Sequence, residues 1–374
     1  MKFKELRSAV LLLTVLAMTL TFASCDGNST MSKTATNNNA ANGTEAADTT
    51  TAKDAASTVA FEFSLSMHDP ITSNNGKFYQ AWADTIYERT EGHVKITIFA
   101  GSTLAPGPEV ETMVETGAVD IGWICTSFYK GQYPLTDITT LPMAGFGNSI
   151  TSTKTLWDMY EKYEELRAEW ENYKVLNLYG NPGMVFGSNI TPIKTPTDLK
   201  GHKLRATAGP IIDYMESLGA SPIMMAPPDM YEALSKHNID GYVFEPAGIN
   251  NFKIQEVTKY LTDMPLYDAV FCLVMNWDKW NSLPKEYQDI FEETTQRAGS
   301  LAAAEDFETA AKEAKQIIAD AGCEWITPTD EAIAEFQKAA EPIIASWPDT
   351  IKLEGFDARA YMIEALELAK KYSE

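Results

Sequence analysis

Two segments far apart in the chain share one pattern of residues. In "PEVETMVETGAVDIGW" Glu109 lies eleven positions before Asp120, and in "PDMYEALSKHNIDGYV" Asp229 lies eleven positions before Asp240. Each segment begins with a proline and a carboxylate, which suit the N-terminus of a helix. Apolar residues then recur at helical spacing, and a short apolar strand accompanies the second aspartate. The pattern therefore predicts two similar strand–helix–strand units, one in each of two lobes.

Strands and helices alternate through the rest of the chain. Segments with the apolar pattern of strands are 61–68, 94–101, 174–180, 184–189, 202–208 and 269–276. A helix is expected from near Pro284 to Gly322, with Gly299 as a weak point; at 1.5 Å per residue it would approach ~57 Å and brace both lobes. This order predicts a two-lobed α/β fold with parallel-rich sheets, whose ligands bind outside the carboxyl ends of the strands.

The first 24 residues have the pattern of a secretory signal peptide. Lys2, Lys4 and Arg7 precede the apolar run "AVLLLTVLAMTLTFAS", and Cys25 follows it. The pattern "LTFASC" resembles the lipobox of bacterial lipoproteins, although Phe22 stands where leucine is usual. We therefore predict that residues 1–24 are removed and that a lipid on Cys25 anchors the protein on the extracytoplasmic face of a membrane. An ordinary cleaved signal with an incidental cysteine is the alternative.

A polar segment separates this cysteine from the remainder of the chain. Residues 26–57 contain no aromatic side chain and almost no apolar one, so burial cannot offset their ordering entropy. A lipid-anchored flexible linker is predicted over 25–58 and a folded domain over 59–374. Within the domain, lobe I is expected over about 59–178 and 272–300, and lobe II over about 179–271 and 301–350.

The net charge restricts the choice of partner. The whole chain carries a formal charge of −22, and residues 1–24 contribute +2, so the part from Cys25 onward carries −24. Such a charge opposes binding to nucleic acid and to anionic lipid surfaces. No segment after the signal approaches the ~20 apolar residues of a membrane span, so contact with the membrane is expected through the lipid alone.

Cysteine and histidine spacing predicts neither a disulfide framework nor a metal site. Cys125, Cys272 and Cys323 are widely spaced and form no CxxC pair, so buried free thiols are expected, with a single disulfide as the alternative. The four histidines, His68, His93, His202 and His237, lack metal-ligand spacing.

Motifs of common enzyme classes are also absent from the sequence. The chain has no GxSxG, HExxH or GxxxxGK[ST] motif, and "GFGNSI" at 145–150 lacks the third glycine of a dinucleotide fingerprint. Acidic pairs such as Glu164 and Glu165 lie in highly charged, helix-like segments typical of a solvated face. We therefore expect no catalytic residues, no cofactor and no enzymatic activity.

Six segments together carry a resemblance to a known family. They are "ETGAVDIGW", "LPM" at 141–143, "TPTDLKGHKLRAT", "LGASPIMMAPPDMYEAL", "NIDGYVFEP" and "EVTKYLT". In this order they resemble the extracytoplasmic solute-binding proteins of TRAP (tripartite ATP-independent periplasmic) transporters, from Phe61 to about Lys352. The resemblance implies a periplasmic-binding-protein-like fold with two α/β lobes around a cleft and a long helix bracing both. It also implies closure around a carboxylated solute, which is then passed to a membrane permease.

One arginine is the foremost candidate for contact with that solute. Arg205, in "GHKLRATAG", occupies the arginine of the family's "GxKxR" strand, its most constant ligand contact. A planar guanidinium holds a carboxylate through two parallel hydrogen bonds. The alternative is a structural salt bridge, for which Glu245 in "VFEP" is a plausible partner.

Further residues are candidates because of their places next to strand ends. Trp123 follows the first of the two repeated strands and Phe244 follows the second, so both are expected to point toward the gap between the lobes, and His68 ends the first strand of the chain. The remaining candidates are Thr207, Met184, Asn276 and, as a ligand contact in its own right, Glu245. Where sialic-acid-binding members of the family carry polar groups, this chain has Val185, Cys125 and Phe128. This departure favours a relatively apolar monocarboxylate over a sugar acid.

Two other functions remain open at this point. The protein could be the binding lipoprotein of an ATP-driven importer for peptides or sugars, in which case its ligands need not be anionic. It could also be a surface-anchored hydrolase with an unrecognised site, which turnover of esters or glycosides would reveal.

Overall fold

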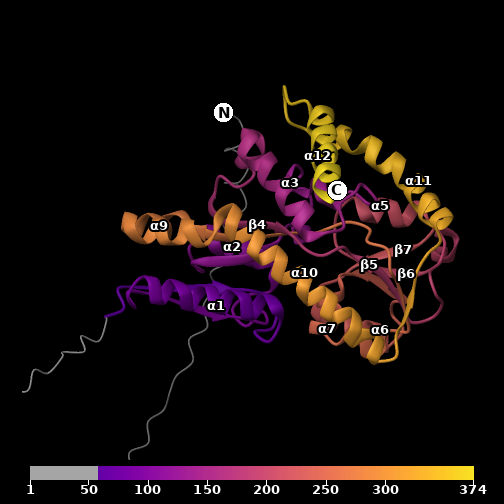
Figure 1. The fold of residues 1–374 in the computed structure, drawn as a ribbon, viewed down its shortest axis with the longest axis horizontal. Coiled ribbons are helices and arrows are strands. Elements are labelled where there is room, and N and C mark those ends of the chain that lie inside the picture. The colour runs from indigo at the N-terminus through magenta and orange to yellow at the C-terminus, as the bar shows by residue number, and fades with distance from the viewer. Residues whose placement is uncertain (1–57) are drawn as a thin grey trace, which may run out of the picture. The chain divides into compact units, whose positions relative to one another are not determined.

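The structure, a computed structural model, describes residues 58–374 (Figure 1). The predicted signal peptide, Cys25 and nearly all of the predicted linker lie outside the described residues. Within residues 58–374, five strands form a first sheet in the order β2-β1-β3-β10-β4, in which β10 alone runs antiparallel to its neighbours. These strands are β1 (Phe61–Ser66), β2 (Val94–Phe99), β3 (Ile121–Cys125), β4 (Tyr173–Gly180) and β10 (Val270–Asn276).

A second sheet of the described chain has six strands in the order β11-β9-β5-β8-β6-β7, with β5 antiparallel to its neighbours. They are β5 (Val185–Ser188), β6 (Lys203–Ala206), β7 (Ser221–Met224), β8 (Gly241–Phe244), β9 (Tyr260–Thr262) and β11 (Glu324–Ile326). Each sheet forms one lobe. The predicted two-lobed α/β fold is confirmed, and both sheets are mixed: two of the four strand pairings in the first and three of the five in the second are parallel.

The repeated sequence pattern corresponds to a repeated topology. Helix α2 (Val110–Glu115) connects β2 to β3 across β1, and α6 (Pro227–Ser235) connects β7 to β8 across β6. The second aspartate of each pattern accepts a hydrogen bond from the backbone of the strand at the centre of its unit, β1 or β6. Ser64 N donates to Asp120 Oδ2 at 2.7 Å, and Lys203 N donates to Asp240 Oδ2 at 2.8 Å. The two predicted strand–helix–strand units are therefore present, one in each lobe.

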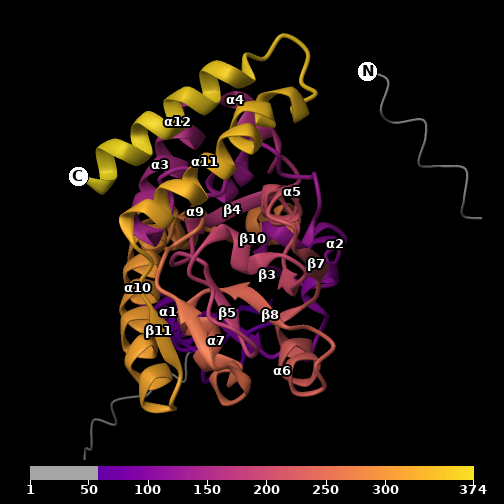
Figure 2. The same ribbon diagram turned by 90° about the vertical axis from the view of Figure 1, so that its right-hand side faces the viewer.

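Helices cover both sheets. In the first lobe α1 (Asn74–Arg89) packs on β2 and α3 (Ser149–Lys162) packs on β4, while α12 (Ala358–Ser373) lies beside α3 (Figures 1 and 2). In the second lobe α11 (Asp330–Ser346) packs on α5 (Pro210–Ser217). The shorter helices are α4 (Glu164–Ala168), α7 (Pro246–Asn251) and α8 (Trp277–Ser282). None of the helices between 58 and 374 is long and apolar enough to cross a membrane.

The long helix is interrupted at a different residue from the one predicted. Helix α9 (Lys285–Thr294) and helix α10 (Gln296–Asp320) are separated by Thr295, whose φ of −126° and ψ of −141° are not helical. Gly299 lies inside α10, where a Cβ atom would lie 2.5 Å from Thr294 O. Glycine at this position therefore allows the end of α9 to lie close to the first turn of α10. Helix α10 contacts α1, α3 and β4 of the first lobe and α7 of the second, which confirms the predicted brace (Figure 1).

The three cysteines of the described chain are buried free thiols, as expected. Residues 58–374 contain no cluster of three or more His, Cys, Asp or Glu side chains that could hold a metal ion.

Candidate ligand-binding site

Arg205 is a fully buried arginine in β6. Its Nε donates to Met225 O at 2.9 Å, and its Nη1 donates to Val243 O at 3.0 Å. Its guanidinium carbon lies 5.0 Å from the centre of the Phe244 ring, a cation–π contact. Burial lowers the pKa of Arg205, yet an arginine keeps its charge in a protein. The guanidinium is thus fixed on two sides, whereas its Nη2 has no hydrogen-bond partner among the described residues.

Glu245 does not pair with Arg205 in the structure. Within residues 58–374 no ion pair joins the two side chains, and Glu245 Oε2 has no hydrogen-bond partner. Glu245 is 4% exposed and is the N-cap residue of α7, with its Oε1 next to Gly248. Burial raises the pKa of Glu245 to about 8, and the nearby Asp69 carboxyl adds to this effect.

The raised pKa of Glu245 predicts a pH-dependent stability. An unfolded glutamate has a pKa of about 4.3. Between these two pKa values the folded protein therefore holds a proton that the unfolded chain has released. The stability that this proton contributes is lost as the pH rises through about 8. Glu245→Gln removes the titrating group, so the variant should gain stability relative to the wild type between pH 6 and pH 9. The relative gain in the free energy of unfolding is about a few kcal/mol at most, and it should appear as a higher relative melting temperature. Thermal denaturation at constant ionic strength measures this difference, and a pH-independent difference would contradict the assignment.

Arg205 and Glu245 line a small cavity between the two lobes. Its other walls are His68, Asp69, Asn75, Cys125, Phe128 and Phe271 from the first lobe, Met184, Thr207, Pro227 and Phe244 from the second, and Phe307 from α10. The cavity volume is about 20 Å³, on the scale of a single water molecule. A ligand of several heavy atoms therefore requires the cavity to enlarge, which a relative movement of the lobes can provide.

His68 and Asp69 form the polar part of the first-lobe wall. The His68 ring stacks on Trp123 with 4.6 Å between ring centres, and burial lowers the pKa of His68 to about 3, so this ring is neutral at pH 7. Its Nδ1 has no partner in the described chain, and its Nε2 lies 3.6 Å from Asp69 Oδ1. Burial raises the pKa of Asp69 to about 6, although Asn75 Nδ2 donates to Asp69 Oδ2 at 3.1 Å.

Most of the residues predicted for the site meet at this cavity. They are Arg205, Glu245, Phe244, His68, Thr207 and Met184. Trp123 is not part of the cavity wall. It lies behind His68, and its Nε1 donates to Tyr179 OH at 2.7 Å, so it supports the wall from within the first lobe.

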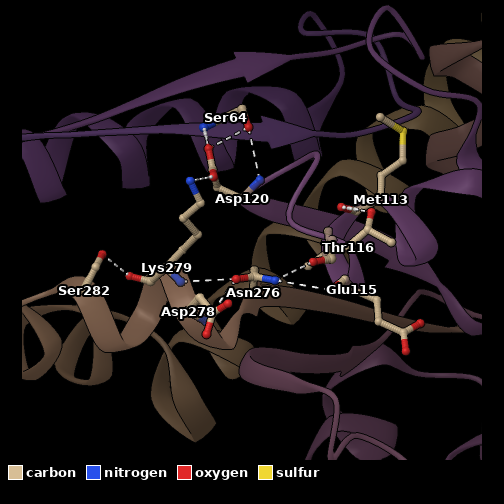
Figure 3. Close-up of polar contacts among 10 residues, drawn as sticks. Ser64, Met113, Glu115, Thr116, Asp120, Asn276, Asp278, Lys279 and Ser282 are labelled. Atoms are coloured by element: carbon tan, nitrogen blue, oxygen red, sulfur yellow. Dashed lines mark hydrogen bonds and ion pairs between the residues drawn. The ribbon is translucent and has the colours of Figure 1, made fainter.

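Asn276 lies away from the cavity, contrary to the prediction. Its Oδ1 accepts from Asp278 N at 3.0 Å and from Lys279 N at 3.2 Å, which caps α8, and its Nδ2 donates to Val114 O at 2.9 Å (Figure 3). The reason is strand direction. Since β10 is antiparallel to β3, the carboxyl end of β10 lies beside the start of β3, whereas the cavity lies at the other end of that strand.

Comparison with known proteins establishes the family. The DctP family of bacterial extracellular solute-binding proteins, family 7, matches residues 65–349. The chain belongs to the DctP family. Its resemblance to TRAP solute-binding proteins is thereby confirmed, and the family consists of solute-binding proteins, not enzymes.

Relatives of this DctP-family chain share its fold over most of their length. A TRAP solute-binding protein of an unidentified marine microbe, specific for aromatic acid ligands and solved with 3-hydroxybenzoate, is 25% identical, with a TM-score of 0.80 over 85% of this chain and 100% of that one. A TRAP protein of Bordetella bronchiseptica with bound mandelate is 25% identical, with a TM-score of 0.76 over 83% and 99%. The 2,3-diketo-L-gulonate-binding periplasmic protein YiaO of Escherichia coli is 28% identical over 251 residues, 66% of this chain and 75% of that protein.

Five cavity residues of this DctP-family protein are not predicted by the sequence patterns, one of which is Asp69, the residue directly after His68. Phe271 lies in the interior of β10 and Phe307 in the interior of α10, where an aromatic residue indicates only a core position. Pro227 is the first residue of α6, where proline is common for local reasons. The sequence does contain a signal for Asn75 as a site residue, because it is a polar residue in the first turn of the helix that follows β1.

A larger groove of about 400 Å³ lies between residues 126–137 of the first lobe and residues 208–224 of the second, against the end of α11. Its polar groups include Lys130 and Asp137. Among the described residues that line it, Ser127 alone has a buried polar atom without a partner, whereas the Arg205 cavity has three such atoms. The smaller cavity is therefore the stronger candidate for recognition of a charged ligand.

Proposed function

We propose that this DctP-family protein captures a small organic acid, a relatively apolar monocarboxylate, in the cavity between its lobes and delivers it to the membrane permease of a TRAP transporter. The observation that carries the proposal is the buried, fixed charge of Arg205, whose Nη2 has no partner among the described residues. A carboxylate can accept from Nη2 and from the second N–H of Nη1 in one plane. Binding then satisfies the guanidinium and neutralises its charge.

The apolar walls support the choice of ligand class. Phe128, Phe244, Phe271 and Phe307 line the same cavity as the arginine, and rings of this kind pack against an apolar or aromatic body. Two relatives of the same fold have 3-hydroxybenzoate and mandelate as ligands, which combine one carboxylate with an aromatic ring.

Selectivity for the free acid tests the proposal. Mass spectrometry of the protein purified without refolding should detect a co-purifying acid, and calorimetry should show binding of that acid but much weaker binding of its methyl ester. The ester keeps the shape of the acid and lacks the charge that Arg205 requires. Equal affinity for acid and ester would contradict a carboxylate site.

The lipid anchor is a separate proposal, carried by the "LTFASC" pattern around Cys25. If Cys25 is acylated, Cys25→Ser should move the protein from the membrane fraction into the soluble or culture fraction while ligand binding is unchanged. Fractionation and immunoblotting measure this. Unchanged retention on the membrane would place the anchor elsewhere.

A further inference from the structure

We propose that the ligand of this cavity carries a hydrogen-bond donor, a hydroxyl or an ammonium group, in addition to its carboxylate, and that Glu245 accepts from this donor. The inference rests on the proposed function, since it assumes a carboxylate on Arg205. It adds a second recognition group to the site and narrows the ligand class to hydroxy acids, phenolic acids and amino acids.

The unpartnered polar atoms of the cavity are the first observation. Among its lining residues in the described chain, Arg205 Nη2, Glu245 Oε2 and His68 Nδ1 are buried without a hydrogen-bond partner. Buried polar groups in folded proteins are nearly always paired, so a cluster of three unpaired atoms around one cavity points to a ligand. A plain carboxylate can pair with the guanidinium, but it has no donor for Oε2 once Glu245 is ionised, which occurs above its pKa of about 8.

The balance of charge is the second observation. The cavity wall contains one cation, Arg205, and two carboxyl groups, Asp69 and Glu245. A bare carboxylate would add a third acidic group where burial excludes water, and it would disfavour the ionised form of Glu245, whose pKa burial already raises to about 8. A hydroxyl or an ammonium group on the ligand offsets this effect because it donates to one of the carboxyl groups.

Glu245 is the carboxyl group that remains available. Asp69 already accepts from Asn75 Nδ2 at 3.1 Å, and its other oxygen lies 3.6 Å from His68 Nε2. Glu245 is the N-cap residue of α7, but its side chain makes no capping hydrogen bond; Oε1 lies close to Gly248, and Oε2 has no partner in the described chain. Its position at the start of α7 therefore leaves Oε2 without a structural role.

Matched pairs of acids test the inference. Calorimetry of the full-length protein would compare phenylacetate with mandelate, benzoate with 3-hydroxybenzoate, and propionate with lactate, in which the second acid of each pair adds one hydroxyl. The wild type is expected to favour the hydroxylated member of the bound pair by about 10- to 100-fold. Glu245→Met, which keeps the length of the side chain but no acceptor, should lose this preference, and Glu245→Gln, which keeps an acceptor oxygen, should retain part of it.

The possible failures are distinguishable. If no acid of the panel binds, or if binding survives Arg205→Ala, the proposed function fails and this inference fails with it. If plain acids bind through Arg205 as tightly as their hydroxylated partners, or if Glu245→Met keeps the preference, the carboxylate site stands and the donor site is overturned.

A measurement on the wild type alone guards against a variant that does not fold. At pH 8, calorimetry in two buffers of different ionisation enthalpy counts the protons that accompany binding. A plain acid raises the pKa of Glu245 by repulsion and takes up a proton, whereas a donor that bonds to the ionised carboxylate reduces this uptake. Equal proton uptake for both members of a pair would overturn the inference.

Discussion

Arg205→Ala is expected to raise the dissociation constant for the ligand acid by roughly 30-fold to several-thousand-fold. Truncation leaves the ligand's charge in a cavity without its partner, a loss of about 2–5 kcal/mol. Arg205→Lys should recover little of this loss, because an ammonium group cannot replace the planar donors that bond to Met225 O, Val243 O and the ligand together. Isothermal calorimetry on the three proteins measures the effect.

The matched control is Arg297→Ala. Arg297 lies on α10, is partly exposed and pairs with Asp158 and Glu161, so its removal deletes an arginine without touching the cavity. Ligand affinity in this variant should remain within about twofold of the wild type, since exposed ion pairs contribute little. If Arg205→Ala lowered the melting temperature steeply while the folded fraction bound the acid normally, Arg205 would be a structural residue, and the ligand's carboxylate would have another partner.

Gly241→Ala is expected to destabilise the second lobe by about 1–3 kcal/mol or more. A Cβ atom at residue 241 would lie 2.2 Å from Gly187 O, a backbone atom of the neighbouring strand β5. Backbone cannot move aside without disturbing the pairing of β5 with β8, on which Val243 O and the position of Arg205 depend. Chemical denaturation monitored by circular dichroism gives the free energy of unfolding, and ligand affinity should fall in parallel.

Gly122→Ala in β3 of the first lobe is the matched control for this prediction. There a Cβ atom would meet Val114 Cγ2 at 2.7 Å and Val110 Cγ1 at 2.9 Å. These are side-chain methyl groups, which can shift by rotation and small displacements, so the loss of stability should be smaller than for Gly241→Ala. Equal losses, or a larger loss for Gly122→Ala, would contradict the argument from backbone contact.

Local sequence patterns determined much of the fold. The proline, the acidic residue and the apolar spacing of the two repeated segments correspond to α2 and α6, and the aspartates at 120 and 240 each fasten a central strand. Each signal extends over about a dozen residues and depends on helix or strand periodicity. This periodicity is a property of the local sequence and does not depend on which segments pack together. The strand of Arg205 belongs to the same group of signals, and the motifs around it indicated the family.

The tertiary structure decided which groups meet. Strands β7, β9 and β11 are only three or four residues long, and their partners in the sheet define them more than their own composition does. Asn276 was excluded from the cavity by the antiparallel direction of β10, and Phe271 and Phe307 were brought into it by elements distant in sequence. Whether Glu245 would pair with Arg205 or leave both side chains available to a ligand was also undecided by spacing. The outcome depends on α7, which begins after Glu245, and on the two carbonyl oxygens that accept from the guanidinium. Such contacts form only when separate segments of the chain pack together.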